Sequence, residues 1–262
     1  MLFNLWLDQP SWLVVLILAA GLAFTAGLVH WLSHHGPTRA GAARLVGIQG
    51  AFFTSISVLF ALFSGFLGND VWERQRQAVR AVQVERDSLL AIGTLSIATV
   101  SDMAPIRAAL RAYVEAVVSD EWPRMADQGQ SALAAQALGD LLREVARPGI
   151  TAEAGAAAHA ALLDLTLRVR TARNERLVIS GGSYDAEKWA TVLMLAVLTQ
   201  IGIGLVQLDR PRPQAAALCA FTTAAVVTLG LLAVRERPFD GAHPIPPDAI
   251  RDVLQAMPVT PG

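Results

Sequence analysis

The sequence predicts an all-α membrane protein, with four transmembrane helices in two pairs and a large helical extramembrane insert between the second and third. The chain is 53% hydrophobic but only 16% charged, whereas soluble domains carry about a quarter charged residues. The charged residues avoid four long windows and crowd into the middle third. Because a charge at mid-bilayer costs about 2.5–3.5 kcal/mol on insertion scales, these windows indicate membrane spans.

The first span is predicted at about 11–32, between two tryptophans. Trp12 and Trp31 lie about 28 Å apart along an α-helix, close to the thickness of a bilayer's hydrocarbon core. Tryptophan is typical of both membrane interfaces. No Lys or Arg precedes this stretch, and its apolar run is longer than the core of a signal peptide. We therefore expect a retained span.

The second span, about 45–68, is predicted to run directly into a charged helix. It contains no charged residue, and then Asp70, Glu73 and Arg74 arrive together. So abrupt a change of composition indicates that the chain crosses a membrane surface near Trp72. The helix is expected to continue into the insert.

The third and fourth spans are predicted at about 189–208 and 214–234. The link 209–213 between them is short, so the two helices are expected to be antiparallel neighbours. The predicted domains are the first transmembrane pair (1–69), the helical insert (70–188), the second transmembrane pair (189–234) and a proline-rich C-terminal tail (235–262).

The insert is predicted to be helical and soluble. It holds no further run long enough to span a bilayer, and Ile106, Leu110, Tyr113 and Val114 repeat at helical spacing. Alternating strand patterns are absent from the sequence. The net charge of −1 gives no basic surface for nucleic acid.

One face of the second span combines small and polar side chains. Thr54, Ser57 and Ser64 could line an ion path, and Phe60 and Phe63 could form a hydrophobic gate that closes by dewetting. The alternative is that the hydroxyls hold helices together and the phenylalanines face lipid or a neighbour. In the third span, Thr199 and Gln200 have the same two interpretations.

Basic residues approach the third span from the insert. Arg173, Arg176 and Lys188 could form a basic vestibule that attracts anions, or could bind anionic head groups. The alternative is that they pair with Glu73 or Glu85 on the helix that leaves the second span.

The sequence gives no support for an enzyme, a cofactor or a metal site. We find no nucleophile elbow, phosphate loop or cluster of metal ligands, and expect no catalytic residue. His34 and His35 are adjacent, but no second pair with ligand spacing accompanies them, so they are interpreted as solvated loop residues. The single cysteine, Cys219, cannot form an internal disulfide.

Four short segments together resemble the bacterial bestrophin-like domain family, whose function is unknown. The segments are Val-Trp-Glu-Arg at 71–74 with Glu85 beyond it, Tyr113 followed by Asp-Glu-Trp-Pro at 120–123, Ala-Arg-Asn-Glu-Arg-Leu at 172–177, and Arg-Pro-Phe-Asp-Gly at 237–241. The resemblance covers nearly the whole chain and keeps the order of the segments.

The resemblance implies a bacterial inner membrane protein whose insert and termini are cytoplasmic, an orientation that the distribution of Lys and Arg does not settle. Bestrophins, from which the family takes its name, are pentameric anion channels. We therefore expect a homo-oligomer, a pentamer by analogy, that conducts anions or small solutes with the second span facing its axis. The alternative is a non-conducting scaffold or sensor whose insert docks a soluble partner in an exposed apolar groove.

Overall fold

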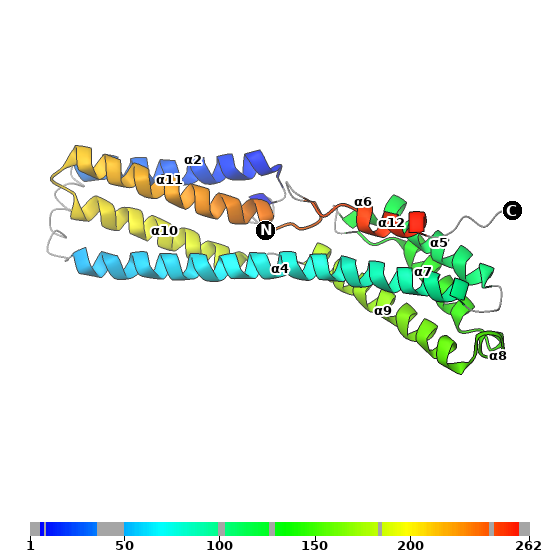
Figure 1. Cartoon of the computed structure of the whole chain (residues 1–262). Coiled ribbons are helices and arrows are strands. Elements are labelled where there is room, and N and C mark those ends of the chain that lie inside the picture. The colour runs from blue at the N-terminus through cyan, green and yellow to red at the C-terminus, as the bar shows by residue number, and fades with distance from the viewer. Residues whose placement is uncertain are drawn as a thin grey trace. The chain divides into compact units, whose positions relative to one another are not determined.

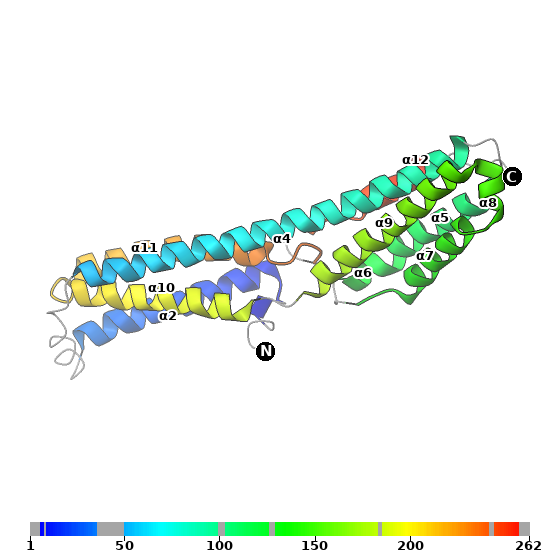
Figure 2. The same cartoon turned by 90° about the horizontal axis from the view of Figure 1, so that it is seen from below.

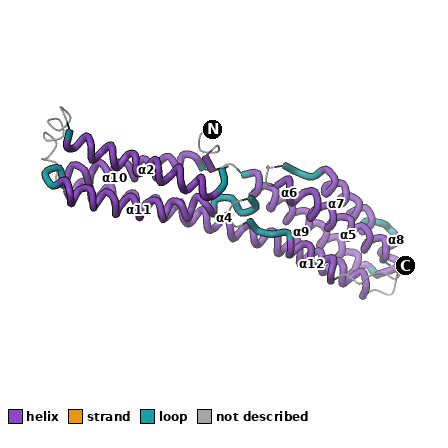
Figure 3. The backbone as a smooth tube through the Cα atoms, turned by 90° about the horizontal axis from the view of Figure 1, so that it is seen from above, coloured by secondary structure: helices purple, strands orange, loops and turns teal. Residues whose placement is uncertain are grey.

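The computed structural model describes residues 6–7, 9–35, 50–98, 103–125, 129–182, 185–240 and 244–256. This described part contains helices and no strand (Figure 3), which confirms the all-α prediction. The helices are α2 (Ser11–His34), α4 (Gly50–Ala98), α5 (Ala104–Ala116), the π-helix η1 (Val117–Glu121), α6 (Trp122–Met125), α7 (Ala132–Val145), α8 (Gly149–Ala154), α9 (Ala156–Gly181), α10 (Ala186–Val206), α11 (Pro211–Arg235) and α12 (Asp248–Ala256).

The chain forms two compact units. The first comprises Met1–Glu73 and Ser183–Glu236, and the second comprises Arg74–Gly182 and Arg237–Gly262. Helix α4 contributes residues to both units.

Four helices in the described part are long and apolar enough to cross a bilayer, and they are α2, the first part of α4, α10 and α11. They coincide with the four predicted spans. Within this first unit, Figures 1 and 2 both show α2, α10 and α11 side by side with the first part of α4. Residues 45–49, where the second span is predicted to begin, lie outside the described part.

Close helix packing in the first unit depends on small residues. Along α2, Val14, Leu18 and Leu22 form a buried stripe at helical spacing. A Cβ atom at Gly204 of α10 would overlap the side chain of Val29, and one at Gly202 would lie 2.6 Å from Phe53 Cδ1. These glycines therefore let α10 approach its neighbours closely, which is how membrane helices gain packing energy without a hydrophobic driving force.

The second unit is built from amphipathic helices around one apolar core. Helix α5 contacts α7, and α7 contacts α9. The predicted stripe on α5 is buried, including Ile106, Leu110 and Tyr113. At the start of α7, the Ser131 hydroxyl accepts a hydrogen bond from the backbone N–H of Ala134 at 3.0 Å, a standard N-cap.

The C-terminal segment contains a helix that the sequence analysis did not foresee. In the predicted proline-rich tail, α12 packs against α5, and its Ile250 and Val253 are fully buried in the core of the second unit. The helix has an apolar side at helical spacing, but it is short and follows three prolines, which hid it from a search for long periodic segments. The tail is therefore partly a structural element of the second unit.

Candidate functional site

A pair of buried, oppositely charged side chains lies in the core of the second unit. Arg176 of α9 and Glu85 of α4 are both fully buried. Arg176 Nε donates to Glu85 Oε2 at 2.8 Å, and Arg176 Nη2 donates to Oε1 at 3.1 Å. The contact is thus bidentate, the geometry that makes arginine–carboxylate pairs strong. Tyr113 of α5 adds a third donor, with its hydroxyl 2.6 Å from Glu85 Oε1.

A second arginine and a second carboxylate complete the cluster. Arg176 Nη2 also donates to Glu121 Oε1 at 2.8 Å. Arg173, one helical turn earlier on α9, donates its Nε to the two Glu121 oxygens at 3.1 and 3.0 Å. Two guanidinium groups therefore meet two carboxylates, and this compensation is what allows four ionised side chains to be buried together.

The local backbone and an aromatic side chain shape the cluster on one side. Glu121 ends the π-helix η1, a widened turn that is rare in proteins and frequent at functional sites. The next residue, Trp122, holds its ring 5.0 Å from Arg176 Cζ, within the range of a cation–π interaction. Trp122 Nε1 donates to the Ile245 carbonyl at 3.1 Å, and Phe239 packs edge-on against the indole at 5.8 Å between ring centroids. The C-terminal segment thus contacts the cluster through Trp122.

Two members of the cluster, Tyr113 and Arg176, have shifted pKa values. Burial and the adjacent Glu85 carboxylate raise the pKa of Tyr113 well above its usual 10.0. Burial lowers the pKa of Arg176, but the charge and hydrogen bond of Glu85, together with Tyr113 and Glu121, raise it above its usual value. The tyrosine therefore stays neutral and the guanidinium stays charged near neutral pH, so both serve as hydrogen-bond donors that join α5 and α9 to Glu85 of α4.

The cluster gives a structural reason why the four segments of the family resemblance, which are distant in the chain, occur in one sequence. Glu85, Tyr113, Glu121 with Trp122, Arg173 with Arg176, and Phe239 come from the four segments that carry the family resemblance. All of them meet at this one place in the second unit. The four segments therefore resemble the family largely because they supply the residues of one buried polar network.

The candidate pore residues on α4 do not all point the same way. Thr54 is exposed, while the partly buried Ser57 donates its hydroxyl to the Phe53 carbonyl at 3.1 Å. Phe60 packs against Phe221 of α11, with 5.4 Å between ring centroids.

Phe63 and Ser64 lie on different sides of the same helix. Ser64 is buried, and its hydroxyl has no hydrogen-bond partner among the described residues. Phe63 is exposed and lies 6.2 Å from the ring of Phe66. In a single chain, the outward side of α4 therefore carries Thr54 and Phe63, whereas Ser57, Phe60 and Ser64 turn toward the helix bundle.

The three candidate vestibule residues fall in two places. Arg173 and Arg176 are buried in the cluster, and Arg176 makes the Glu85 contact that the pairing alternative expects. Lys188 belongs to the first unit, where its half-exposed ammonium pairs with Asp70 at 2.5 Å and with Asp185 at 3.1 Å. Glu121, the second partner of Arg176, was not among the expected partners.

The polar side chains of the third span bind neighbouring helices. Gln200 is fully buried, and its Nε2 donates at 3.0 Å both to the Leu22 carbonyl and to Thr222 Oγ1. Thr25 donates to Gln200 Oε1 at 2.6 Å, and Thr199 bonds back to the Leu195 carbonyl within its own helix. Gln200 thus joins α10 to α2 and α11, whereas Thr199 does not.

A histidine pair that the sequence analysis overlooked lies at the end of α2. His30 Nδ1 and His34 Nε2 lie 2.7 and 2.9 Å from the same atom, Oε1 of the fully buried Gln214. The sequence analysis considered the adjacent residues His34 and His35. Residues four apart, such as His30 and His34, are the ones that share a helix face. Within the described residues no group of three or more metal-ligating side chains occurs.

The four apolar helices and the helical second unit define the class of protein, a four-pass helical membrane protein. The chain belongs to the bestrophin-like domain family, whose family model matches residues 10–250. No curated protein matches the sequence.

Solved structures of low sequence identity share the fold. A crystal structure of a bacterial bestrophin homologue from Klebsiella pneumoniae superposes with a TM-score of 0.68 at 11% identity, covering 90% of this chain and 97% of that one. A second mutant form of the Klebsiella protein gives a TM-score of 0.66 at 14% identity, covering 90% and 98%. A crystal structure described only as a membrane protein gives 0.69 at 11% identity, covering 93% and 98%. At these identities the likeness shows the fold.

Proposed function

We propose that this chain assembles into a homo-oligomer and forms a passive pore for anions or small solutes in the bacterial inner membrane. A pentamer, with the insert 70–188 and both termini in the cytoplasm, is the arrangement that the likeness to bestrophins favours. The membrane surface would then lie near Asn69 and Trp189. The two compact units and the family membership support this proposal.

The observation that carries the proposal is the outward face of α4. Val58, Leu62 and Phe66 are exposed by 60%, 49% and 56%, and they follow one another at four-residue spacing along one side of the helix. Ser55, Gly65 and Asn69 are exposed on the same side. This face therefore alternates bulky apolar side chains with small and polar ones, as a pore with hydrophobic constrictions requires.

The outward face of α2 has a different character, and the contrast indicates which helix faces the axis. The large exposed side chains of α2 include Trp12, Phe24 and Trp31, an apolar surface with tryptophan at both ends that suits lipid. The outward face of α4, by contrast, interrupts its bulky apolar side chains with the small residues Ser55 and Gly65, which leave room along the helix for a solute. We therefore assign α4 to the axis and α2 to the lipid.

The placement of the side chains refines the candidate pore residues. Thr54 and Phe63 lie on or beside the outward face and stay in the proposal. Ser57, Phe60 and Ser64 turn toward neighbouring helices of the same chain, so a role for them in lining the pore requires α4 to rotate.

Passive conduction fits the composition of the spans. No Asp, Glu, Lys or Arg occurs within 11–34, 50–69, 189–208 or 213–234. Ion-coupled pumps and transporters use intramembrane ionisable residues. A passive pore needs none.

The experiment is reconstitution of the purified chain into chloride-loaded liposomes, combined with a mass measurement of the protein in detergent. We expect protein-dependent chloride efflux that follows the imposed gradient, and a mass equal to several chains. Efflux no faster than from empty liposomes, together with a monomeric mass, contradicts the proposal.

A scaffold or sensor is the alternative, and it expects an exposed apolar groove on the second unit. A groove with a volume of about 620 Å³ lies between α4 and α9. Val178 is its most exposed apolar residue, but Arg80, Asn174 and Glu175 also line it. Most of its lining residues thus carry polar or charged groups, unlike the apolar groove that a docking insert is expected to expose. The conducting pore is the better supported function.

A further inference from the structure

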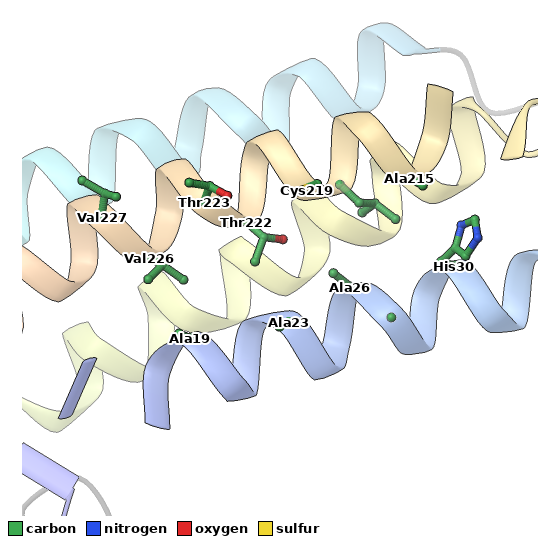
Figure 4. A pocket seen from close by; sticks show the side chains of 12 residues that line it. Ala19, Ala23, Ala26, His30, Ala215, Cys219, Thr222, Thr223, Val226 and Val227 are labelled. Carbon is green, nitrogen blue, oxygen red and sulfur yellow. The ribbon is translucent and has the colours of Figure 1, made fainter. Parts of the chain in front are cut away.

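A groove runs along the membrane unit between α2 and α11. Its volume is about 520 Å³. Figure 4 shows Ala19, Ala23 and Ala26 on α2 facing Thr222 and Val226 on α11. These short side chains leave the space open, and a Cβ at Gly27, another lining residue, would meet nothing within 4 Å.

One end of the groove is polar. His30 lines it at the end where Ala215 lies (Figure 4). Because the Gln214 oxygen can only accept, His30 donates to it through Nδ1–H. Gln214 thus fixes the ring at the mouth of the groove.

The same end is positively charged. Arg212 is exposed and lies three residues before Ala215, so both are on one face of α11. It belongs to the first turn of α11, which begins at Pro211, where the helix dipole also favours an anion. Arg210 and Asp209 precede it in the short link, so the link and first turn together carry one net positive charge.

The length of the groove matches one leaflet of a bilayer. From Ala19 to His30 the helix rises about 16 Å, and half of a hydrocarbon core is about 15 Å. Trp31 directly follows His30 and is exposed, as expected for a residue at the head-group level. The apolar length of the groove thus lies at the depth of acyl chains, and its charged end lies at the depth of phosphates.

We propose that this groove binds one acyl chain of an anionic phospholipid from the surrounding bilayer, with the lipid phosphate held near His30 and Arg212. A helix from a second copy would fill the apolar length, but the net positive charge at the mouth favours an anionic head group there. The lipid satisfies both ends. This site is independent of conduction, because it lies between α2 and α11 and not on the outward face of α4.

The first test uses the unmodified chain. Cys219 is the only cysteine, is exposed and lines the groove. We expect phosphatidylglycerol, added to delipidated protein in uncharged detergent, to slow alkylation of Cys219 by N-ethylmaleimide several-fold, and phosphatidylcholine at equal concentration to slow it much less. Equal protection by the two lipids, or none by either, overturns the proposal. Equal protection by a free fatty acid also overturns it, because the phospholipid head group would then be unnecessary.

The second test fills the groove and uses a matched control. Gly27→Leu places a side chain in the groove, whereas Gly21→Leu makes the same change on α2 at a residue that does not line it and has equal space. Native mass spectrometry should show phosphatidylglycerol retained by the control and lost from Gly27→Leu. If Gly27→Leu keeps the lipid, the groove is not the lipid site. If it keeps the lipid and also changes the number of chains per particle, the groove is a contact between copies of the chain.

The third test addresses the charged end. Arg212→Gln should reduce the preference for phosphatidylglycerol over phosphatidylcholine about fivefold, the effect of one basic residue beside an anionic lipid. Wild-type preference in this variant contradicts the assigned position of the phosphate.

Discussion

Arg176 and Glu85 are joined by two hydrogen bonds of 2.8 and 3.1 Å in the fully buried core of the second unit, although 91 residues separate them in the sequence. A pair so far apart in the chain fixes α9 against α4 in one register. Arg176 also binds Glu121 and lies against Trp122, so it is the residue on which most of the cluster converges.

Removing one member of this pair should destabilise the second unit strongly. Glu85→Leu leaves the two arginines with one carboxylate, and breaking a buried pair in this way costs about 3–5 kcal/mol. The double variant with Arg176→Met removes the uncompensated charge as well, while Glu121 keeps Arg173. We expect the double variant to be more stable than Glu85→Leu, as measured by urea unfolding in detergent.

An exposed pair on the same helix is the control. Arg168 donates to Asp164 at 2.8 Å on the surface of α9, and such pairs contribute little. Asp164→Ala should change the free energy of unfolding by less than about 1 kcal/mol. If Asp164→Ala lowers the free energy of unfolding as much as Glu85→Leu does, the buried cluster stabilises the protein no more than an exposed ion pair.

Tyr113 should resist ionisation at alkaline pH. Burial and Glu85 raise its pKa well above 10.0 in the folded chain, so between pH 10 and that raised pKa the folded state holds a proton that the unfolded state has lost. Stability therefore falls as the pH rises through this range. The chain has two tyrosines, so in a Tyr184→Phe variant the tyrosinate absorbance reports on Tyr113 alone.

The absorbance titration of Tyr113 should differ between the folded and the unfolded variant. The folded variant should show no tyrosinate step near pH 10, and the same protein in denaturant should show a full one. A step near pH 10 in the folded protein would mean that Tyr113 is solvated and that the cluster is open.

The all-α class and the four apolar helices could be predicted because a charged residue in hydrocarbon is costly, and that signal needs no knowledge of neighbouring helices. The sequence analysis offered pairing of the basic residues with Glu73 or Glu85 as an alternative to a vestibule, and the contact of Arg176 with Glu85 is one such pair. It missed Glu121, because that contact depends on a π-helix and on the packing of α5 against α7. The contact of Phe60 with Phe221 likewise depends on where α11 lies, so periodicity along α4 could define its faces but not their partners.

Gly204 should tolerate no side chain. A Cβ there would overlap Val29, whose branched side chain is held in one rotamer on a helix. Overpacking of this kind costs about 1–3 kcal/mol, against a helix-propensity gain of at most about 1 kcal/mol. Gly204→Ala should therefore lower the thermal unfolding temperature in detergent. Gly65→Ala, at a glycine of α4 with nothing within 4 Å, should leave it unchanged or raised, and equal behaviour of the two variants would contradict the packing of α10 on α2.

Phe66 should restrict conduction, and its effect can be separated from that of a lipid-facing phenylalanine. Phe66 on α4 and Phe24 on α2 are exposed by 56% and 70%, so truncating either to alanine removes a ring from the surface of a single chain. If α4 faces the axis, Phe66→Ala widens and hydrates a hydrophobic constriction and raises chloride efflux from liposomes, whereas Phe24→Ala faces lipid and leaves efflux at the wild-type rate. The reverse result would place α2 at the axis. Equal effects of the two variants would mean that neither helix forms the narrowest point, and the assignment of α4 would fail while the four-span fold stood.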